Sequence, residues 1–185
     1  RDGEEVAASG TRGCGGKVDG EGANVAAGYA GRSAVDDERP RIAVVERNTH
    51  TRHLGIGFLQ GYGLKSGAVA TSVSHDSHNI IVVGTGEADM AAAANRVGGL
   101  KGGRVVCDGG KPVAEVPRSI AGIMSDEPLT TVNEKLEVAK AKAHALGVNP
   151  GIDPFMTLSF MALPVIPSLR ITTRGVFDVT TQSYV

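Results

Sequence analysis

The sequence feature that most constrains the fold is a polar hexapeptide between two apolar runs. Residues 74–79 read Ser-His-Asp-Ser-His-Asn, and the purely apolar residues 80–83 follow them directly. Small and β-branched residues occupy positions 68–73, just before the hexapeptide. A short, continuously apolar run is typical of a strand that is buried on both faces. The pattern therefore predicts two strands of one sheet with a polar turn fixed between them.

This turn concentrates groups that could carry chemistry. Two of the five histidines, His75 and His78, lie within four residues of each other, together with Asp76 and Ser77. A buried strand would hold these side chains rigidly at the mouth of a crevice. The same residue types also cap backbone groups in ordinary turns, so a structural role is the alternative. We name the four residues as candidate catalytic residues.

Three further residues are candidate contacts to a substrate or to a partner surface. Asn79 ends the polar hexapeptide, and Ser125 and Asp126 precede a long predicted helix. The last two residues could instead cap that helix, since its N-terminus favours hydroxyl and acidic side chains.

A metal site is not predicted in this chain. His75 and His78 offer two nitrogen ligands, and a stable zinc site needs three or four. His50 and His53 repeat the spacing, but they lie in a stretch whose composition is typical of a solvated loop. A site that joins both pairs would require a fold that brings the two stretches together.

Composition limits the remaining classes of protein. A chain of 185 residues is enough for one domain and buries about 70% of its unfolded surface. The net charge is −1 without a basic patch, so nucleic acid is not expected as a partner. No apolar segment is long enough to span a membrane. Two cysteines cannot form a disulfide framework, which favours the cytoplasm.

The chain divides into two parts by composition. Residues 1–40 are rich in glycine and poor in large apolar side chains, so they cannot offset the entropy of ordering. We expect an irregular linker or arm there. Because residue 1 is Arg rather than Met, we also expect the chain to be a piece of a longer protein.

Residues 41–185 predict one α+β domain, a mixed β-sheet with two main helices. Residues 155–163 are apolar and aromatic, and either a strand or a buried helix fits them. The prolines at 164 and 167 predict extended chain. The predicted strands are 42–45, 55–63, 68–73, 80–83, 104–107, 113–116 and 175–179, and the predicted helices are 87–97 and 129–146.

A series of motifs in this part resembles the C-terminal domain of bacterial adenine deaminases, in the order of that family, from about Arg41 to the end of the chain. Their common order is far more specific than any single motif. Two loops depart from the family pattern, with Asn48 in place of a His and Arg118-Ser119 in place of Leu-Pro. The motifs are residues 41–47, 57–64, 73–79, 89–96, 120–125, 154–167 and 175–179.

The resemblance implies a role in the hydrolytic deamination of adenine to hypoxanthine and ammonia. In this family a metal-bearing barrel precedes the domain, and its divalent metal, manganese or iron, activates water. The implied partners are adenine, that barrel in the same or a neighbouring chain, and further copies in a homo-oligomer. The histidines of this chain include no His-x-His pair of the kind that opens amidohydrolase metal sites. We therefore expect the isolated chain to lack the catalytic metal and to be inactive.

Three functions fit these observations. The chain could buttress and partly line the active site of the barrel. It could instead be a catalytically silent module for folding or oligomerisation, with the apolar residues 155–166 as its interface. It could also be an independent enzyme that uses His75, Asp76 and His78 for acid–base catalysis, although no nucleophile or metal ligand set accompanies them.

Overall fold

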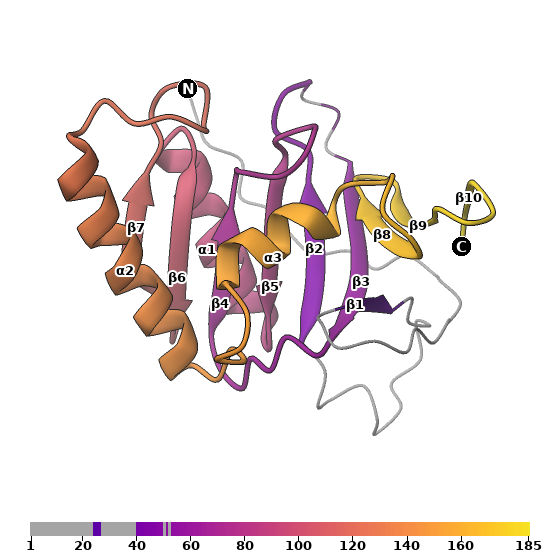
Figure 1. Ribbon diagram of the computed structural model, residues 1–185, viewed down its shortest axis with the longest axis horizontal. Coiled ribbons are helices and arrows are strands. Elements are labelled where there is room, and N and C mark those ends of the chain that lie inside the picture. Colours follow the sequence, from indigo (N-terminus) through magenta and orange to yellow (C-terminus); the bar gives the residue numbers. More distant parts are fainter. Residues whose placement is uncertain (1–23, 27–39, 50, 52) are drawn as a thin grey trace.

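The computed structural model describes residues 24–26, 40–49, 51 and 53–185. Strands and helices alternate irregularly along this part of the chain (Figure 1). In chain order the elements are β1 (Asn24–Ala26), β2 (Arg41–Val45), β3 (Leu54–Gln60), β4 (Ala68–Thr71), β5 (Ile80–Gly84), α1 (Glu87–Gly99), β6 (Gly103–Asp108), β7 (Lys111–Pro117), α2 (Leu129–Ala145), α3 (Pro154–Met161), β8 (Leu169–Thr172), β9 (Gly175–Asp178) and β10 (Ser183–Tyr184).

The large sheet has seven strands in the order β1-β3-β2-β5-β4-β6-β7. Every neighbouring pair in it is antiparallel, so the prediction of a mixed sheet is wrong. Short connections join β2 to β3 and β6 to β7, and such connections allow only antiparallel pairing. Helix α1 joins β5 to β6, but β4 lies between these two strands, so the crossover creates no parallel pair.

Helices cover both faces of this sheet. Figure 1 shows α2 and α3 in front of the sheet and α1 behind it. Alternate residues of β5 serve the two sides: Ile81 and Val83 belong to the core under α2 and α3, whereas Ile80 and Val82 belong to the core under α1. All five residues of β5 are buried, which confirms the prediction of a strand buried on both faces.

The structure has three helices, not two, among the described residues. The third is α3, which resolves the choice that the sequence left open for residues 155–163. Asp153 caps its N-terminus by accepting hydrogen bonds from the backbone N–H groups of Phe155 and Met156, and Pro154 occupies the first turn. Both are standard signals for the start of a helix.

A small antiparallel sheet, β10-β9-β8, follows α3. Strand β9 confirms the predicted final strand, whereas β8 and β10 were not predicted. The prolines at 164 and 167 lie in turns and bends, so the prediction of extended chain there is wrong. Leu169, Ile171 and Val176 join the core under α2 and α3, which fixes the small sheet beside the large one.

The irregular arm predicted for residues 1–40 lies mostly outside the described residues. Two parts of it are described. Strand β1 pairs antiparallel with β3, with Asn24 opposite Gln60, and the carbonyl of Pro40 accepts a hydrogen bond from the Leu59 N–H group at 2.9 Å.

Candidate functional site

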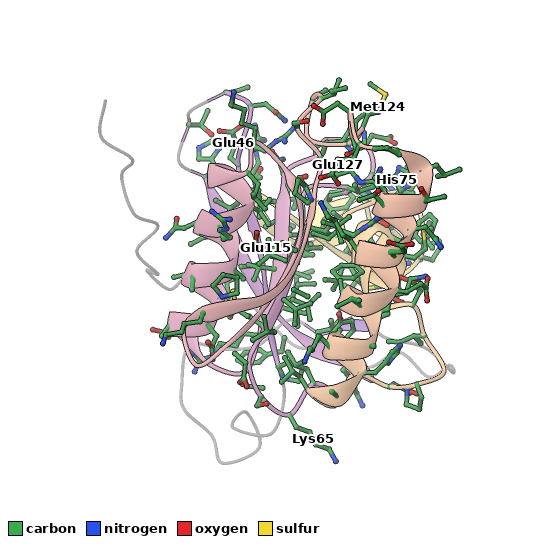
Figure 2. The ribbon with its side chains drawn as sticks, turned by 90° about the vertical axis from the view of Figure 1, so that its left-hand side faces the viewer. Glu46, Lys65, His75, Glu115, Met124 and Glu127 are labelled. Atoms are coloured by element: carbon green, nitrogen blue, oxygen red, sulfur yellow. The ribbon has the colours of Figure 1, made fainter. Side chains whose placement is uncertain are left out.

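Three loops meet at one end of the large sheet. They are residues 46–49 after β2, residues 72–79 between β4 and β5, and residues 118–128 between β7 and α2. Figure 2 views the molecule from its β7 side and shows Glu46, His75, Met124 and Glu127 at this end, with Lys65 at the opposite end. Because β4 and β5 are buried along their whole length, the loop between them is held firmly at both of its ends.

The loop brings His75 and His78 together against α3. Their ring centroids are 6.1 Å apart, and the His75 ring lies 5.3 Å from the ring of Phe160. The backbone N–H group of His75 donates to the carbonyl of Ser159 at 3.1 Å, and the backbone N–H group of His78 donates to the carbonyl of Ser74 at 2.7 Å. Helix α3 therefore orients the first imidazole, and Phe160 is a contact that the sequence did not predict.

Two buried polar atoms of this loop have no hydrogen-bond partner among the described residues. They are Oγ of Ser74, a residue that is 0% exposed, and Nδ1 of His78. A buried polar group without a partner costs about 1–3 kcal/mol, and native structures leave few of them. These two atoms therefore mark a place where a further group could bind.

The other residues of the hexapeptide differ in exposure. Asp76 and Ser77 are exposed, whereas Asn79 is buried. The side-chain oxygen of Asn79 accepts a hydrogen bond from the Arg47 N–H group at 3.1 Å, and the side-chain nitrogen of Asn48 donates to the carbonyl of Ser77 at 2.9 Å. The loop after β2 thus fixes the hexapeptide from the other side. Contacts of Asn79 with a substrate stay a prediction.

Ser125 and Asp126 do not cap α2. The helix begins after Pro128 without a side-chain cap. Instead, Oγ of Ser125 accepts a hydrogen bond from the Glu127 N–H group at 3.2 Å, and Oδ1 of Asp126 accepts one from the Ser119 hydroxyl at 2.9 Å. Both residues shape the loop at residues 118–128.

A polar cluster that the sequence did not predict joins the three loops through hydrogen bonds. The Ser72 hydroxyl donates to the carbonyl of Gly122 at 2.5 Å and accepts from the Gly103 N–H group at 2.8 Å. Nη2 of Arg47 donates to the carbonyl of Ala121 at 2.7 Å. Gly122 has a φ of 78°, and a Cβ added there would lie 1.7 Å from Nη1 of Arg47. A side chain at this position would force the guanidinium of Arg47 to move, and the positive φ favours glycine. Gly122 is therefore a sequence signal of this polar cluster.

An open pocket lies beside this polar cluster. Arg47 and Lys101 make its wall basic, and Asn48 connects it to the hexapeptide. Its lining consists of Arg47, Asn48, Gly98, Lys101, Ser119 and Ala121.

Glu46 organises the loop after β2. Its carboxylate accepts hydrogen bonds from the N–H groups of Asn48 and Thr49, both at 2.5 Å, and of Thr51 at 3.1 Å. Burial raises the pKa of this carboxyl, but the hydrogen bonds from the three residues outweigh it and leave the pKa below its ordinary value. Glu46 is therefore a charged anchor for the loop rather than a proton acceptor.

The part of the chain that the structure describes contains neither a metal-ligand cluster nor a membrane-spanning helix. No group of three or more His, Cys, Asp or Glu side chains there could hold a metal ion. No helix there is long and apolar enough to cross a membrane.

Comparison with known proteins gives one consistent family. A family model described as the adenine deaminase C-terminal domain matches residues 21–183. The adenine deaminase of Brucella anthropi is 53% identical over 145 residues, which cover 78% of this chain and 26% of that protein. The adenine deaminase of Bacillus subtilis is 48% identical over 139 residues, which cover 75% of this chain and 24% of that protein.

The adenine deaminase of Nitratidesulfovibrio vulgaris (strain DP4) gives the same result, with 49% identity over 145 residues, 78% of this chain and 25% of that protein. The chain spans about a quarter of the length of the curated relatives it matches. The family model covers nearly all of the domain whose hexapeptide, polar cluster and helix α3 are described above. The chain belongs to the adenine deaminase C-terminal domain family.

Proposed function

We propose that this chain is the C-terminal part of an adenine deaminase, and that residues 74–79 help to close the adenine site of a metal-bearing catalytic part in the same or a neighbouring chain. The observation that carries the proposal is the pair of buried polar atoms, Ser74 Oγ and His78 Nδ1, that no described residue satisfies. The cytoplasm, which the cysteine content predicts, is the location that we propose.

The chemistry of the hexapeptide suits a purine. Adenine has ring nitrogens that accept hydrogen bonds and an amino group that donates them, and imidazole, hydroxyl and carboxylate groups can pair with both. His75 is packed on Phe160, so it suits a wall of the site. Asp76 is exposed, so its carboxylate can reach a group outside this chain. In this proposal His78 and Asp76 orient the base.

The remaining candidate residues have supporting roles in this proposal. Asn79 holds the hexapeptide through its bond with Arg47. Ser77 is exposed beside Asp76 and could donate or accept a hydrogen bond. Ser125 and Asp126 lie in the loop at residues 118–128, at the same end of the sheet, and stay predicted contacts to the catalytic part.

The catalytic part would hold the metal. A divalent manganese or iron ion bound there would activate the water that attacks the ring carbon. His75, Asp76 and His78 do not form a group that could hold an ion. The work that we propose for them is to bind adenine, to orient it and to exclude bulk water.

A second candidate function is a module for folding or oligomerisation without contact to adenine. Its supporting observation is a row of exposed apolar side chains on and after α3. Met156 is 51% exposed, Phe160 38% and Val165 67%, which is unusual for large apolar residues that have no partner surface. This function predicts that changes in the row alter assembly, whereas changes at Asp76 and His78 have no effect on turnover.

The test is a chimera in which residues 21–183 replace the matching C-terminal quarter of the Bacillus subtilis adenine deaminase. The chimera is expected to deaminate adenine. Asp76→Ala and His78→Ala are each expected to lower kcat about tenfold or more with little change in the thermal midpoint, because about 1.4 kcal/mol of lost transition-state stabilisation is tenfold in rate.

The matched control is Asp108→Ala, which removes an exposed carboxylate at the last residue of β6, at the opposite end of the sheet. This variant is expected to keep full activity. Unchanged turnover in folded Asp76→Ala and His78→Ala chimeras would contradict a role in the adenine site and favour the second candidate function.

The isolated chain gives a separate test. It is expected to release no ammonia from adenine and to retain less than one equivalent of divalent metal after dialysis. Ammonia release by the purified chain would contradict the proposal that catalysis needs another part of the enzyme.

A further inference from the structure

Arg104 of β6 and Arg118, the residue that follows β7, project from the same face of the large sheet. Arg104 of β6 lies opposite Val116 of β7. The Arg118 N–H group donates to the carbonyl of Gly102 at 3.0 Å, which extends the ladder beyond the end of β7. Because side chains alternate along a strand, Val116 and Arg118 share a face. On that face Arg104 lies directly opposite Val116 and diagonally opposite Arg118. Val116 belongs to the core under α2 and α3, so both arginines face that side.

The two guanidinium groups carry more donors than their surroundings accept. The guanidinium of Arg104 lies 5.6 Å from the ring centre of Phe155, a contact that accepts no strong hydrogen bond. Nε and Nη1 of Arg104 and Nε of Arg118 are buried without hydrogen-bond partners in the described chain. Burial and the charge of Arg118 lower the pKa of Arg104, and the charge of Asp153 raises it without outweighing them. The pair therefore has buried donors without partners and a positive charge that is compensated only in part.

The carboxylate whose charge acts on Arg104 is Asp153, and its direct partners are other groups. Asp153 accepts hydrogen bonds from two backbone N–H groups of α3 and pairs with Lys140 at 3.1 Å. Oε1 of Glu127 pairs with Lys135, whereas its buried Oε2 has no hydrogen-bond partner among the described residues. No ion pair joins a carboxylate to either arginine within the described residues. Charged groups that lose solvent need a partner of opposite charge.

We propose that Arg104 and Arg118 form an anion site that binds an oxyanion, either a carboxylate or a phosphate group. Arginine suits both groups because its N–H donors match the spacing of their oxygens. A carboxylate could come from another part of the enzyme, and a phosphate group could come from a free ligand. The site uses none of the residues of the proposed adenine site, so its failure would leave that proposal untouched.

The test uses the purified chain with ¹⁵N-labelled arginine. The Nε–Hε signals of Arg104 and Arg118 are followed while inorganic phosphate or acetate replaces chloride at constant ionic strength. Both signals are expected to shift together and to saturate with one of these anions. Arg118→Gln is expected to weaken the binding about tenfold or more, which corresponds to the loss of one charge-assisted hydrogen bond.

The two anions distinguish the two sources. Saturation by phosphate at lower concentration than by acetate supports a free ligand that carries a phosphate group. Saturation by acetate with no preference for phosphate supports a carboxylate from another part of the enzyme.

Arg96 is the matched internal control. Its Nε and Nη2 atoms already donate to Glu115 at 2.6 and 2.9 Å, so its signal is expected to stay in place. If Arg118→Gln fails to fold, Arg118→Lys keeps the charge but loses the guanidinium, and the same weakening is expected. An absence of saturable shifts with both anions, or an equal response from Arg96, would overturn the proposal.

Discussion

The two faces of the large sheet differ in the side chains that fill them. The face under α1 is packed mainly with small residues, such as Ala70, Ala93 and Ala94, and no exposed large apolar side chain lies in α1. The face under α2 and α3 is packed with larger side chains such as Phe155 and Leu158. Exposed apolar side chains lie on or beside its helices, namely Ile120, Met124, Leu129, Val138, Met156, Phe160 and Val165.

The two faces also differ in how many of their polar groups have hydrogen-bond partners. On the α1 side, Arg96 pairs with Glu115 through two bonds, and Asp89 accepts the Gly110 N–H group at 2.6 Å. The exception on this side is Nε of Arg47, which is buried without a hydrogen-bond partner among the described residues. On the other side, buried atoms that have no partner among the described residues occur in Ser74, His78, Arg104, Arg118 and Glu127. We infer that the α1 face pairs nearly all of its buried polar groups within this chain, whereas the α2/α3 face has several groups that another surface or ligand could satisfy.

The largest effect is expected from Phe155→Ala. Phe155 is 2% exposed and lies between α3 and the sheet, under the guanidinium of Arg104. Its removal is expected to cost about 3–5 kcal/mol of the free energy of unfolding, because the cavity cannot fully collapse. Urea unfolding measures the loss, and Phe155→Leu, which keeps most of the volume, is the control. A loss below about 1 kcal/mol would show that large side chains do not hold the α2/α3 face.

The sequence predicts most of the large sheet because its strands carry local signals. The run at 80–83 reads as a strand buried on both faces, and Asp108-Gly109-Gly110-Lys111 reads as a hairpin turn, with both glycines at positive φ. Strand β8 escapes prediction because it follows two prolines and contains Arg170. That residue is 5% exposed, and its guanidinium donates to the carbonyls of Leu169 and Pro167, at 2.6 and 2.9 Å. The neighbouring backbone pairs with both Nη atoms of Arg170, although its buried Nε has no partner among the described residues, and a charged residue inside a strand interrupts the apolar pattern.

The candidate site is predictable only in part, for a related reason. The hexapeptide stands out because its polar residues are consecutive. Its packing partner, Phe160, lies more than 80 residues away on a helix that is apolar on nearly all sides, so no periodic pattern marks the contact. Arg104 and Arg118 become neighbours only through the register of β6 and β7. Contacts that tertiary structure creates leave no local signal.

The second prediction concerns Cys107, which is buried in the core under α1. Burial, with the nearby charges of Asp89 and Glu115, raises the pKa of its thiol from 9.0 to about 11. In a Cys14→Ser background, the folded chain should react with a thiol reagent at pH 8 at least about 100-fold more slowly than the unfolded chain, since two pKa units reduce the thiolate about 100-fold. Comparable rates in both states would show that the α1 face opens readily.

The same shift gives a pH dependence of stability. The unfolded thiol loses its proton near pH 9, whereas the folded thiol keeps it until about pH 11. The free energy of unfolding contributed by this group is therefore constant below pH 9 and falls as the pH rises from 9 to 11. Cys107→Ala is expected to lack this fall in urea unfolding across that range.

The third prediction concerns the Ser72 hydroxyl, a fully paired polar group. It bonds to Gly122 and Gly103 and is 0% exposed, so Ser72→Ala leaves a carbonyl and an N–H group without partners. A loss of about 1–3 kcal/mol in the free energy of unfolding is expected. Ser72→Cys, which keeps a weak donor and acceptor, should lose less. Equal stability of Ser72→Ala and the unaltered chain would mean that the polar cluster of the three loops contributes little to the free energy of unfolding.

The smallest effect is expected from Ser74→Ala, which sharpens the contrast between the faces. Ser74 is as buried as Ser72 and lies two residues further along the same connection, but its Oγ has no partner among the described residues. Removing an unpaired hydroxyl breaks no bond within the chain, so the free energy of unfolding of the isolated chain should change by less than about 0.5 kcal/mol or should rise. In the adenine deaminase chimera, the same substitution removes a group that the catalytic part or adenine would satisfy, and kcat/KM should fall. A large loss of stability in the isolated chain, with unchanged kcat/KM in the chimera, would show that Ser74 serves the fold of this chain alone.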